Sequence, residues 1–193
     1  MSSRDKIISA LKSNQPDKVE LPAIVNFEQS EKDVVKKFSD TLKFIGGNVV
    51  EVSSYSDVIN YVKETFTEAK RVLSSIKELE SIAEVKDIYD DPHSLENVDL
   101  TVLKVHFGVA ENGAVWITDD QLSARALPFI SEYLAVVLEK EKIVATMHDA
   151  YDRIANANYG FGAFIAGPSK TSDIEQSLVL GAHGPKGMTV FLI

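Results

Sequence analysis

The sequence contains no cysteine in its 193 residues. The chain therefore forms no disulfide, offers no thiolate nucleophile and cannot hold a cysteine-ligated iron–sulfur cluster. The absence of disulfides fits a reducing compartment. Histidine is also scarce, with four residues, and no two of them have the spacing of a structural zinc site, so we predict no metal.

Long apolar runs and a basic surplus are missing as well. No stretch approaches the roughly 20 apolar residues that a membrane helix needs. The first residues, Met1 to Lys6, turn charged at once and lead into no apolar segment, so we expect no signal peptide and a cytoplasmic protein. There are 20 Lys and Arg against 29 Asp and Glu, a formal charge of −9, which argues against a nucleic-acid partner.

Helical and extended patterns alternate along the chain. Residues 1–29 read as a short helix and an arm, and residues 30–193 as one domain. Within the domain, helices are predicted near 34–45, 55–67, 76–83 and 146–154. We expect an α/β fold with a central, mostly parallel sheet. Its predicted strands are 48–52, 71–74, 100–106, 133–138, 161–166 and 188–193, with a further strand at 114–118. The nearly continuous apolar run at 133–138 is typical of a central strand buried on both faces.

Glu111 lies in a glycine-containing turn, Gly108-Val-Ala-Glu-Asn-Gly113, between two predicted strands. A carboxylate in such a turn can act as a base, a nucleophile or a binding group. The structural alternative is a β-hairpin in which Asn112-Gly113 forms a type I′ turn.

A second candidate segment, residues 166–175, directly follows a predicted strand. Several of its residues suit a phosphate or carboxylate: Gly167, Ser169, Lys170 and Thr171. A helix beginning near Asp173 would direct free N–H groups to the same place. Ligands in open α/β sheets bind beyond the carboxyl ends of strands, where we expect these residues to meet Glu111. The alternative is a helix start capped by Ser172 or Asp173.

Two further residues lie on loops. His183, between glycines in Gly181-Ala-His-Gly-Pro185, suits a general acid or base or an anion ligand. The alternative is a histidine that holds the turn through the backbone. Arg125 either forms a solvated salt bridge or holds a carboxylate with two hydrogen bonds.

Taken together, these segments resemble a known family. The strings Gly167-Pro-Ser-Lys-Thr-Ser-Asp-Ile-Glu175 and Gly181-Ala-His-Gly-Pro185 are similar to the GPSxTxDIE and GxHGP signature of the LUD domain, the lactate utilization family. The Ala110–Gly113 turn resembles the family's AETG segment, and Arg125 with Leu127-Pro128 resembles its approach to a central strand. Asn112 and Ala114 depart from the family pattern, which usually has threonine at both places.

The resemblance implies a fold shared with glucosamine-6-phosphate deaminases, ribose-5-phosphate isomerases and CoA transferases. It implies a subunit of a cytoplasmic system that oxidises L-lactate to pyruvate, with iron–sulfur clusters only in partner proteins, since this chain has no cysteine and no cofactor of its own. Glu111 and His183 are then the candidate catalytic residues. The candidate ligand-binding residues for a small anion are Gly113, Arg125, Gly167, Ser169, Lys170, Thr171, Asp173, Glu175 and Gly184.

Two alternatives stay open at this point. The Glu-Asn-Gly turn resembles one in which some CoA transferases carry a nucleophilic glutamate, so Glu111 could serve a CoA- or acyl-transferase. The other alternative is a phosphosugar-binding protein, with Ser169, Lys170 and Thr171 on the phosphate.

Overall fold

The computed structural model describes residues 2–17, 19–20, 33–86, 91–155, 157–172 and 178–193. The chain divides into two compact units, Met1–Ser30 and Glu31–Ile193. In the first unit the predicted N-terminal helix is confirmed as α1 (Ser3–Ser13), capped by the reciprocal hydrogen bonds of Ser2 and Asp5. No helix among the described residues has both the length and the hydrophobicity to cross a membrane.

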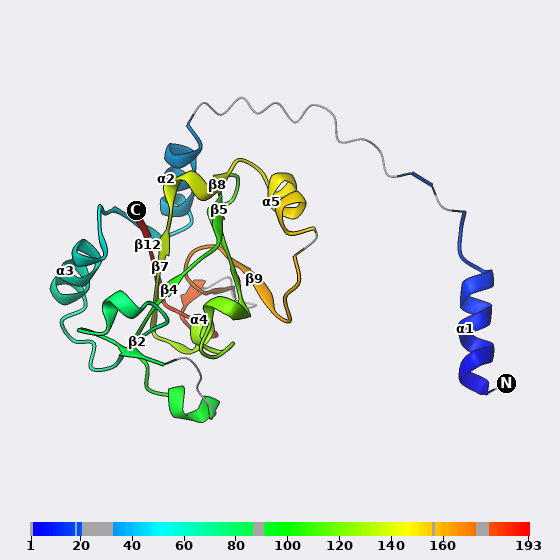
Figure 1. Ribbon diagram of the computed structural model, residues 1–193, viewed down its shortest axis with the longest axis horizontal. Helices are drawn as coiled ribbons and strands as arrows, with labels where there is room; N and C mark the ends of the chain where they lie inside the picture. The colour runs from blue at the N-terminus through cyan, green and yellow to red at the C-terminus, as the bar shows by residue number, and fades with distance from the viewer. Residues whose placement is uncertain (1, 18, 21–32, 87–90, 156, 173–177) are drawn as a thin grey trace. The chain divides into compact units, whose positions relative to one another are not determined.

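The second unit is built on a six-stranded parallel sheet, which confirms the predicted α/β class (Figure 1). The strand order is β1-β12-β7-β4-β2-β3. The strands are β1 (Asn48–Glu51), β2 (Val72–Ser74), β3 (Glu84–Val85), β4 (Leu100–Lys104), β7 (Tyr133–Leu138) and β12 (Gly187–Leu192). As predicted from its apolar run, β7 is central, paired with β12 on one side and β4 on the other.

A four-stranded sheet, in the order β8-β5-β6-β9, packs beside the first. Its strands are β5 (Phe107–Val109), β6 (Ala114–Thr118), β8 (Ile143–Val144) and β9 (Gly162–Ile165). The assignment of residues 161–166 to the central sheet is therefore wrong. β9 pairs antiparallel with β6, with Phe164 opposite Trp116, and this pairing between distant segments leaves no mark in the periodicity of a short apolar run.

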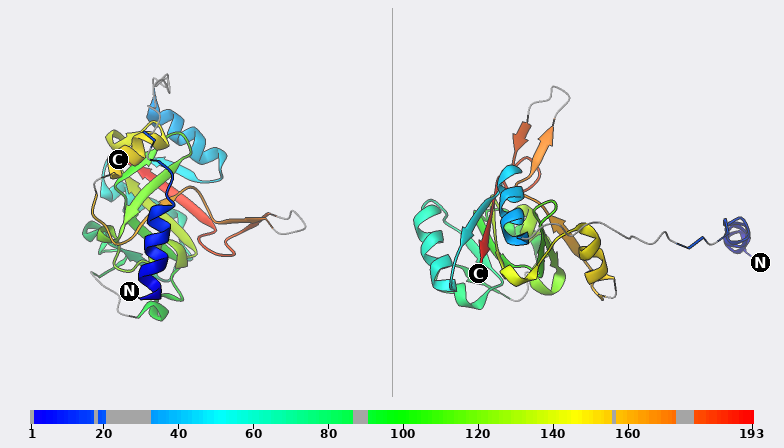
Figure 2. Two further views of the ribbon diagram at one scale, coloured as in Figure 1. Left: turned by 90° about the vertical axis from the view of Figure 1, so that its right-hand side faces the viewer. Right: turned by 90° about the horizontal axis from the view of Figure 1, so that it is seen from above.

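The remaining elements are helices, 3₁₀ turns and one hairpin. The helices are α2 (Val34–Phe44), α3 (Tyr55–Thr65), α4 (Leu127–Ile130) and α5 (Met147–Ile154), and the 3₁₀ turns are Lys77–Leu79, Pro92–Leu95, Asp119–Gln121 and Lys140–Lys142. β10 (Lys170–Ser172) and β11 (Leu178–Leu180) form a hairpin that projects from the second unit (Figure 2).

The predicted helix at 76–83 is wrong, because only one 3₁₀ turn forms there. Residue 84 pairs with Leu73 in the neighbouring parallel strand. Because β2 and β3 are parallel, the nine residues between Ser74 and Glu84 must carry the chain back to the end of the sheet where β2 begins. So short a connection has no room for a longer helix.

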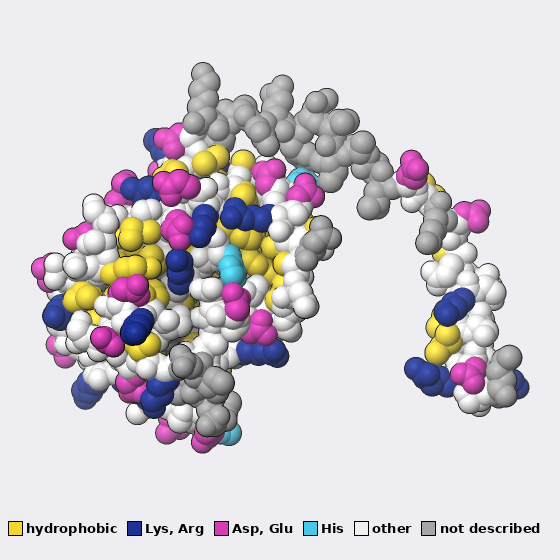
Figure 3. Space-filling view, in the orientation of Figure 1, with side chains coloured by type: hydrophobic (Ala, Val, Ile, Leu, Met, Phe, Trp, Pro, Cys, Tyr) yellow, Lys and Arg dark blue, Asp and Glu magenta, His cyan; other side chains and the backbone are white. Residues whose placement is uncertain are grey.

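The second unit is layered, with helices on the faces of its sheets (Figure 1). Successive side chains of a strand belong to different layers. On β7, Leu134, Val136 and Leu138 face the core between the two sheets, which also contains α2, whereas Ala135 and Val137 face α3. α5 covers the outer face of the second sheet. Acidic and basic side chains are interspersed over the face of this unit in view in Figure 3.

Helix α2 fills the space between the sheets with one face. Asp33 caps its N-terminus by accepting a hydrogen bond from the Lys36 amide at 2.9 Å. Phe38 and Leu42, one turn apart, are fully buried, and a Cβ atom at position 108 would lie 3.0 Å from the Phe38 ring. Gly108 therefore admits the ring between helix and sheet.

We expect Phe38→Ala to destabilise the protein by about 3–5 kcal/mol, because the substitution leaves a cavity between the two sheets. The matched control is Phe44→Ala on the same helix, where the side chain is 90% exposed and the change should stay within about 0.5 kcal/mol. Urea denaturation measures both. Equal losses in the two variants would contradict the position given to α2.

Candidate functional site

The signature loop 181–185 immediately precedes β12 and so lies at the amino edge of the parallel sheet. Residues 96–99 precede β4 and residues 129–132 precede β7, so these loops reach the same edge. We expected the site at the carboxyl edge, where open α/β sheets bind ligands. The structure instead gathers these loops at the opposite edge, because each lies before its strand in the chain.

The two signature segments are joined through their backbones. The Ser169 amide donates to the Pro185 carbonyl at 2.8 Å, and the Gly181 amide donates to the Ser169 carbonyl at 3.1 Å. At Gly184 a Cβ atom would lie 3.2 Å from the Ser169 Cβ, so a side chain there would push the segments apart. Ser169 and Gly184 thus lie side by side, and His183 is the residue before Gly184.

A groove of about 410 Å³ opens beside this junction. The 181–184 loop forms one wall, Asn97 lies on a second, and Phe129 and Ser131 on a third. Within the described part of the chain, the amides of Ala182, His183 and Gly184 donate no hydrogen bond. Gly181, at φ +78°, turns the chain where the loop begins, and free backbone N–H groups in such a turn are anion donors.

The acidic side chains of the groove are partly neutralised. The Asp99 carboxylate accepts hydrogen bonds from the Lys70 and Arg71 amides at 2.7 and 2.8 Å. Glu132 forms an ion pair with Lys186, and this hydrogen bond, aided by Tyr133, raises the pKa of Lys186. Glu96 is the third acidic residue of the lining, so the anion donors of this groove are the backbone amides on its 181–184 side.

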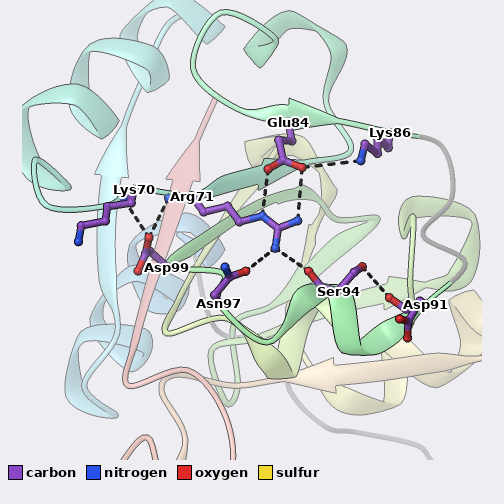
Figure 4. A network of polar contacts seen from close by, with 8 residues as sticks. All are labelled: Lys70, Arg71, Glu84, Lys86, Asp91, Ser94, Asn97 and Asp99. Atoms are coloured by element: carbon purple, nitrogen blue, oxygen red, sulfur yellow. Dashed lines mark hydrogen bonds and ion pairs between the residues drawn. The ribbon is translucent and has the colours of Figure 1, made fainter.

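Arg71 anchors the wall that carries Asn97 (Figure 4). Its guanidinium donates to Glu84 at 2.9 Å, to the Ser94 carbonyl at 2.6 Å and to the Asn97 side-chain oxygen. The Arg71 hydrogen bond also lowers the pKa of Glu84. Arg71, the residue before β2, thereby positions the loop that leads into β4.

Lys170 does not line this groove. Its ammonium group donates to the Ile45 carbonyl at the C-terminal end of α2, where helix carbonyls lack partners. Gly167, at φ +72°, packs on the same residue, since a Cβ atom would lie 3.1 Å from Ile45 Cγ1. Thr171 pairs with Val179 inside the β10–β11 hairpin.

Glu111 is at the tip of the β5–β6 hairpin and likewise does not line the groove. Its carboxylate accepts a hydrogen bond from the Met147 amide at 2.7 Å, and its own amide donates to the Ala145 carbonyl at 3.0 Å. Met147 is the first residue of α5, so Glu111 supplements the cap formed by Thr146 and Asp149. The contact is one that stabilises a helix.

The predicted hairpin is confirmed, but its turn type is wrong. Val109 pairs with Ala114, so residues 110–113 form the connection in place of a two-residue type I′ turn. The Asn112 side chain accepts from the Ala114 amide at 3.0 Å, and Gly113 has φ +70°. A Cβ atom at Gly113 would lie 3.1 Å from the Leu42 backbone, so this turn also packs on α2.

The other candidate residues are placed apart or not described. Arg125 donates to Asp119 at 3.0 Å and is 62% exposed at its side chain, which agrees with the salt-bridge interpretation. Asp173 and Glu175, with the helix predicted from Asp173, lie outside the described residues. The flanking residues form the strands β10 and β11.

Residues 35–193 match the model of the LUD domain family. The chain belongs to this family. It is 32% identical over 108 residues to lactate utilization protein C of Shouchella clausii, covering 51% of this chain and 47% of that protein. It is 27% identical over 163 residues to the protein of the same name from Halalkalibacterium halodurans, covering 79% and 69%.

The match to the Shouchella clausii protein thus spans about half of that relative's length. Among solved structures, a DUF162 family protein from Deinococcus radiodurans aligns with a TM-score of 0.63 at 16% identity, over 82% of this chain and 95% of that one. At this identity the likeness shows the fold.

Sequence reasoning missed Asn97, Ser131 and the Glu132–Lys186 pair. All of them directly precede strands of the parallel sheet and converge only once the strand order is known. The position of Lys186, next to the signature loop, was the one available signal.

We expect Glu111→Ala to lower the free energy of unfolding by about 0.5–2 kcal/mol, because α5 loses a hydrogen-bond acceptor at its N-terminus. Glu111→Gln keeps an acceptor oxygen and should lose less. Glu64→Ala on the exposed side of α3 is the control and should change stability little. Unaltered stability of the alanine variant in chemical denaturation would show that Glu111 does not hold α5.

Proposed function

We propose that this protein is a lactate-utilization subunit that binds a small hydroxy-acid anion, with L-lactate as the first candidate. Membership of the LUD domain family and the printed name of its relatives, lactate utilization protein C, support the proposal. Because the chain has no cysteine, electron transfer belongs to iron–sulfur partner proteins in a cytoplasmic system.

One observation carries the choice of site. The two signature segments are tied together at Ser169, and the amides of Ala182, His183 and Gly184, which donate to no other described residue, lie in the lining of a groove. Ser169 is not part of the groove's lining, but its hydroxyl lies next to Gly184, 3.5 Å from where a Cβ atom of residue 184 would be. Among the described residues this hydroxyl has no hydrogen-bond partner. A carboxylate can accept the amide hydrogen bonds, while His183 and Ser169 meet the 2-hydroxyl group. His183 then serves as the acid–base residue of the site.

Neither alternative function has an observation in its favour. The Glu111 carboxylate accepts from the Met147 amide, so a nucleophilic role would require breaking a helix cap. The ammonium of Lys170 donates to the Ile45 carbonyl, so the phosphate site of a phosphosugar-binding protein would lack its cation.

Thermal-shift and calorimetric titration of the intact protein with L-lactate test the proposal. A ligand at 100 times its dissociation constant should stabilise the fold by about 2.7 kcal/mol. Ser169→Ala and His183→Gln should each weaken binding by about tenfold, the equivalent of about 1.4 kcal/mol. Pyruvate, a sugar phosphate and an acyl-CoA are the comparison ligands.

His93→Gln is the matched control, because the His93 side chain is 94% exposed and lies outside the groove. This variant should bind as the wild type does. The proposal fails if L-lactate produces neither a shift nor heat, or if it binds all three variants with the same affinity.

A further inference from the structure

A second cavity, of about 340 Å³, opens between the second sheet and the C-terminal end of α5. None of its lining residues belongs to the signature segments. Phe107, Trp116 and Tyr159 provide its apolar part, and Trp116 lies edge-on to Tyr159 with ring centroids 5.4 Å apart. Small-molecule sites often have this volume, and polar or charged side chains form the rest of this lining.

Arg153 is the positively charged residue of the lining that can bind an anionic group of a ligand. Its guanidinium lies 4.9 Å from the centre of the Phe107 ring and donates to the Lys142 carbonyl at 3.4 Å. No carboxylate among the described residues pairs with it, whereas the Lys142 ammonium pairs with Glu139 at 2.9 Å. A guanidinium with open N–H groups suits the two oxygens of a carboxylate.

The acidic residues of the cavity already have partners. Asp119 accepts from Arg125 at 3.0 Å, and the Asp120 carboxylate lies 3.1 Å from His106 Nε2. Burial raises the pKa of Asp120, but the hydrogen bonds that it accepts, the strongest from Thr118, outweigh this effect and lower it. Both acids therefore have partners of their own, and Arg153 has no opposing charge among the described residues.

His106 lines the cavity and is held through one of its two ring nitrogens. Asp120 and Thr118 both contact Nε2, and Nδ1 has no hydrogen-bond partner within the described residues. A histidine oriented in this way by a carboxylate can exchange a hydrogen bond with a hydroxyl or carbonyl group through its other nitrogen.

We propose that this cavity is a separate binding site for a small aromatic carboxylate. The ligand's ring packs on Tyr159, which is 39% exposed, and on the accessible edge of Trp116. Its carboxylate binds Arg153, and a hydroxyl or oxo group next to the carboxylate meets His106. This site is independent of the 181–184 groove in both its residues and its preference for an aromatic body.

Trp116 makes the site directly measurable. It is the single tryptophan of the chain and lies in the wall of this cavity and outside the lining of the other groove. L-phenyllactate added to the full-length protein should change tryptophan emission saturably. L-lactate, which lacks the ring, and 2-phenylethanol, which lacks the carboxylate, should each bind at least about tenfold more weakly.

Substitution of Arg153 tests the assignment. Arg153→Gln should weaken phenyllactate binding by about tenfold or more, and Arg153→Lys, which keeps the charge without the planar fork, by less. Arg4→Gln, the same change in α1, should have no effect. Unchanged emission at about 10 mM phenyllactate, ten times a weak millimolar dissociation constant, overturns the proposal.

Two other results overturn it as well. One is equal binding of 2-phenylethanol and phenyllactate, which indicates an apolar cavity without carboxylate recognition. The other is wild-type affinity in both Arg153 variants. Because Ser169→Ala and His183→Gln leave this cavity intact, they should bind phenyllactate normally even if L-lactate binding at the groove is lost or never existed.

Discussion

The C-terminal turn of α2 is the contact on which the arrangement of the signature segments depends. The turn at Gly113 and the turn at Gly167 both pack on this part of the helix, on Leu42 and Ile45 respectively. Both glycines have positive φ and neither has room for a Cβ atom, so the close approach requires glycine twice. Lys170 adds a hydrogen bond to the Ile45 carbonyl at the helix end.

From this anchor the chain leads directly to the groove. The segment that leaves Gly167 reaches Ser169, which holds the 181–185 loop through two backbone hydrogen bonds. That loop then enters β12, which lies between β1 and β7 in the parallel sheet. The packing of α2 between the sheets therefore fixes the position of the 181–185 loop, because Gly167 and Ser169 connect the two. Lys170 stabilises this structure through the Ile45 carbonyl, while residues 181–184 line the groove.

Much of the fold is readable in the sequence where local pattern and burial agree. The run at 133–138 indicates a strand buried on both faces, and the structure places β7 between β12 and β4. The spacing of Phe38 and Leu42 predicts the buried face of α2. The wrong assignment of residues 161–166 arises because the sheet to which β9 belongs is decided by its pairing with β6, far away in the chain.

The candidate site is less predictable for the same reason. The motifs identify Ser169 and His183, but not the edge of the sheet at which they meet, because that depends on the direction and order of the strands. The role of Glu111 depends on Met147, which is 36 residues further along the chain. The sequence around Glu111 therefore does not predict that this residue caps α5.

The most direct test of the central claim is the backbone amide spectrum of the isotope-labelled protein during titration with L-lactate. The free amides of Ala182, His183 and Gly184 should show the largest shifts, and those of Glu111 and Met147 should stay close to their starting positions. Large shifts at Glu111 and Met147 with none in the 181–184 loop would contradict an anion site at the amino edge of the sheet.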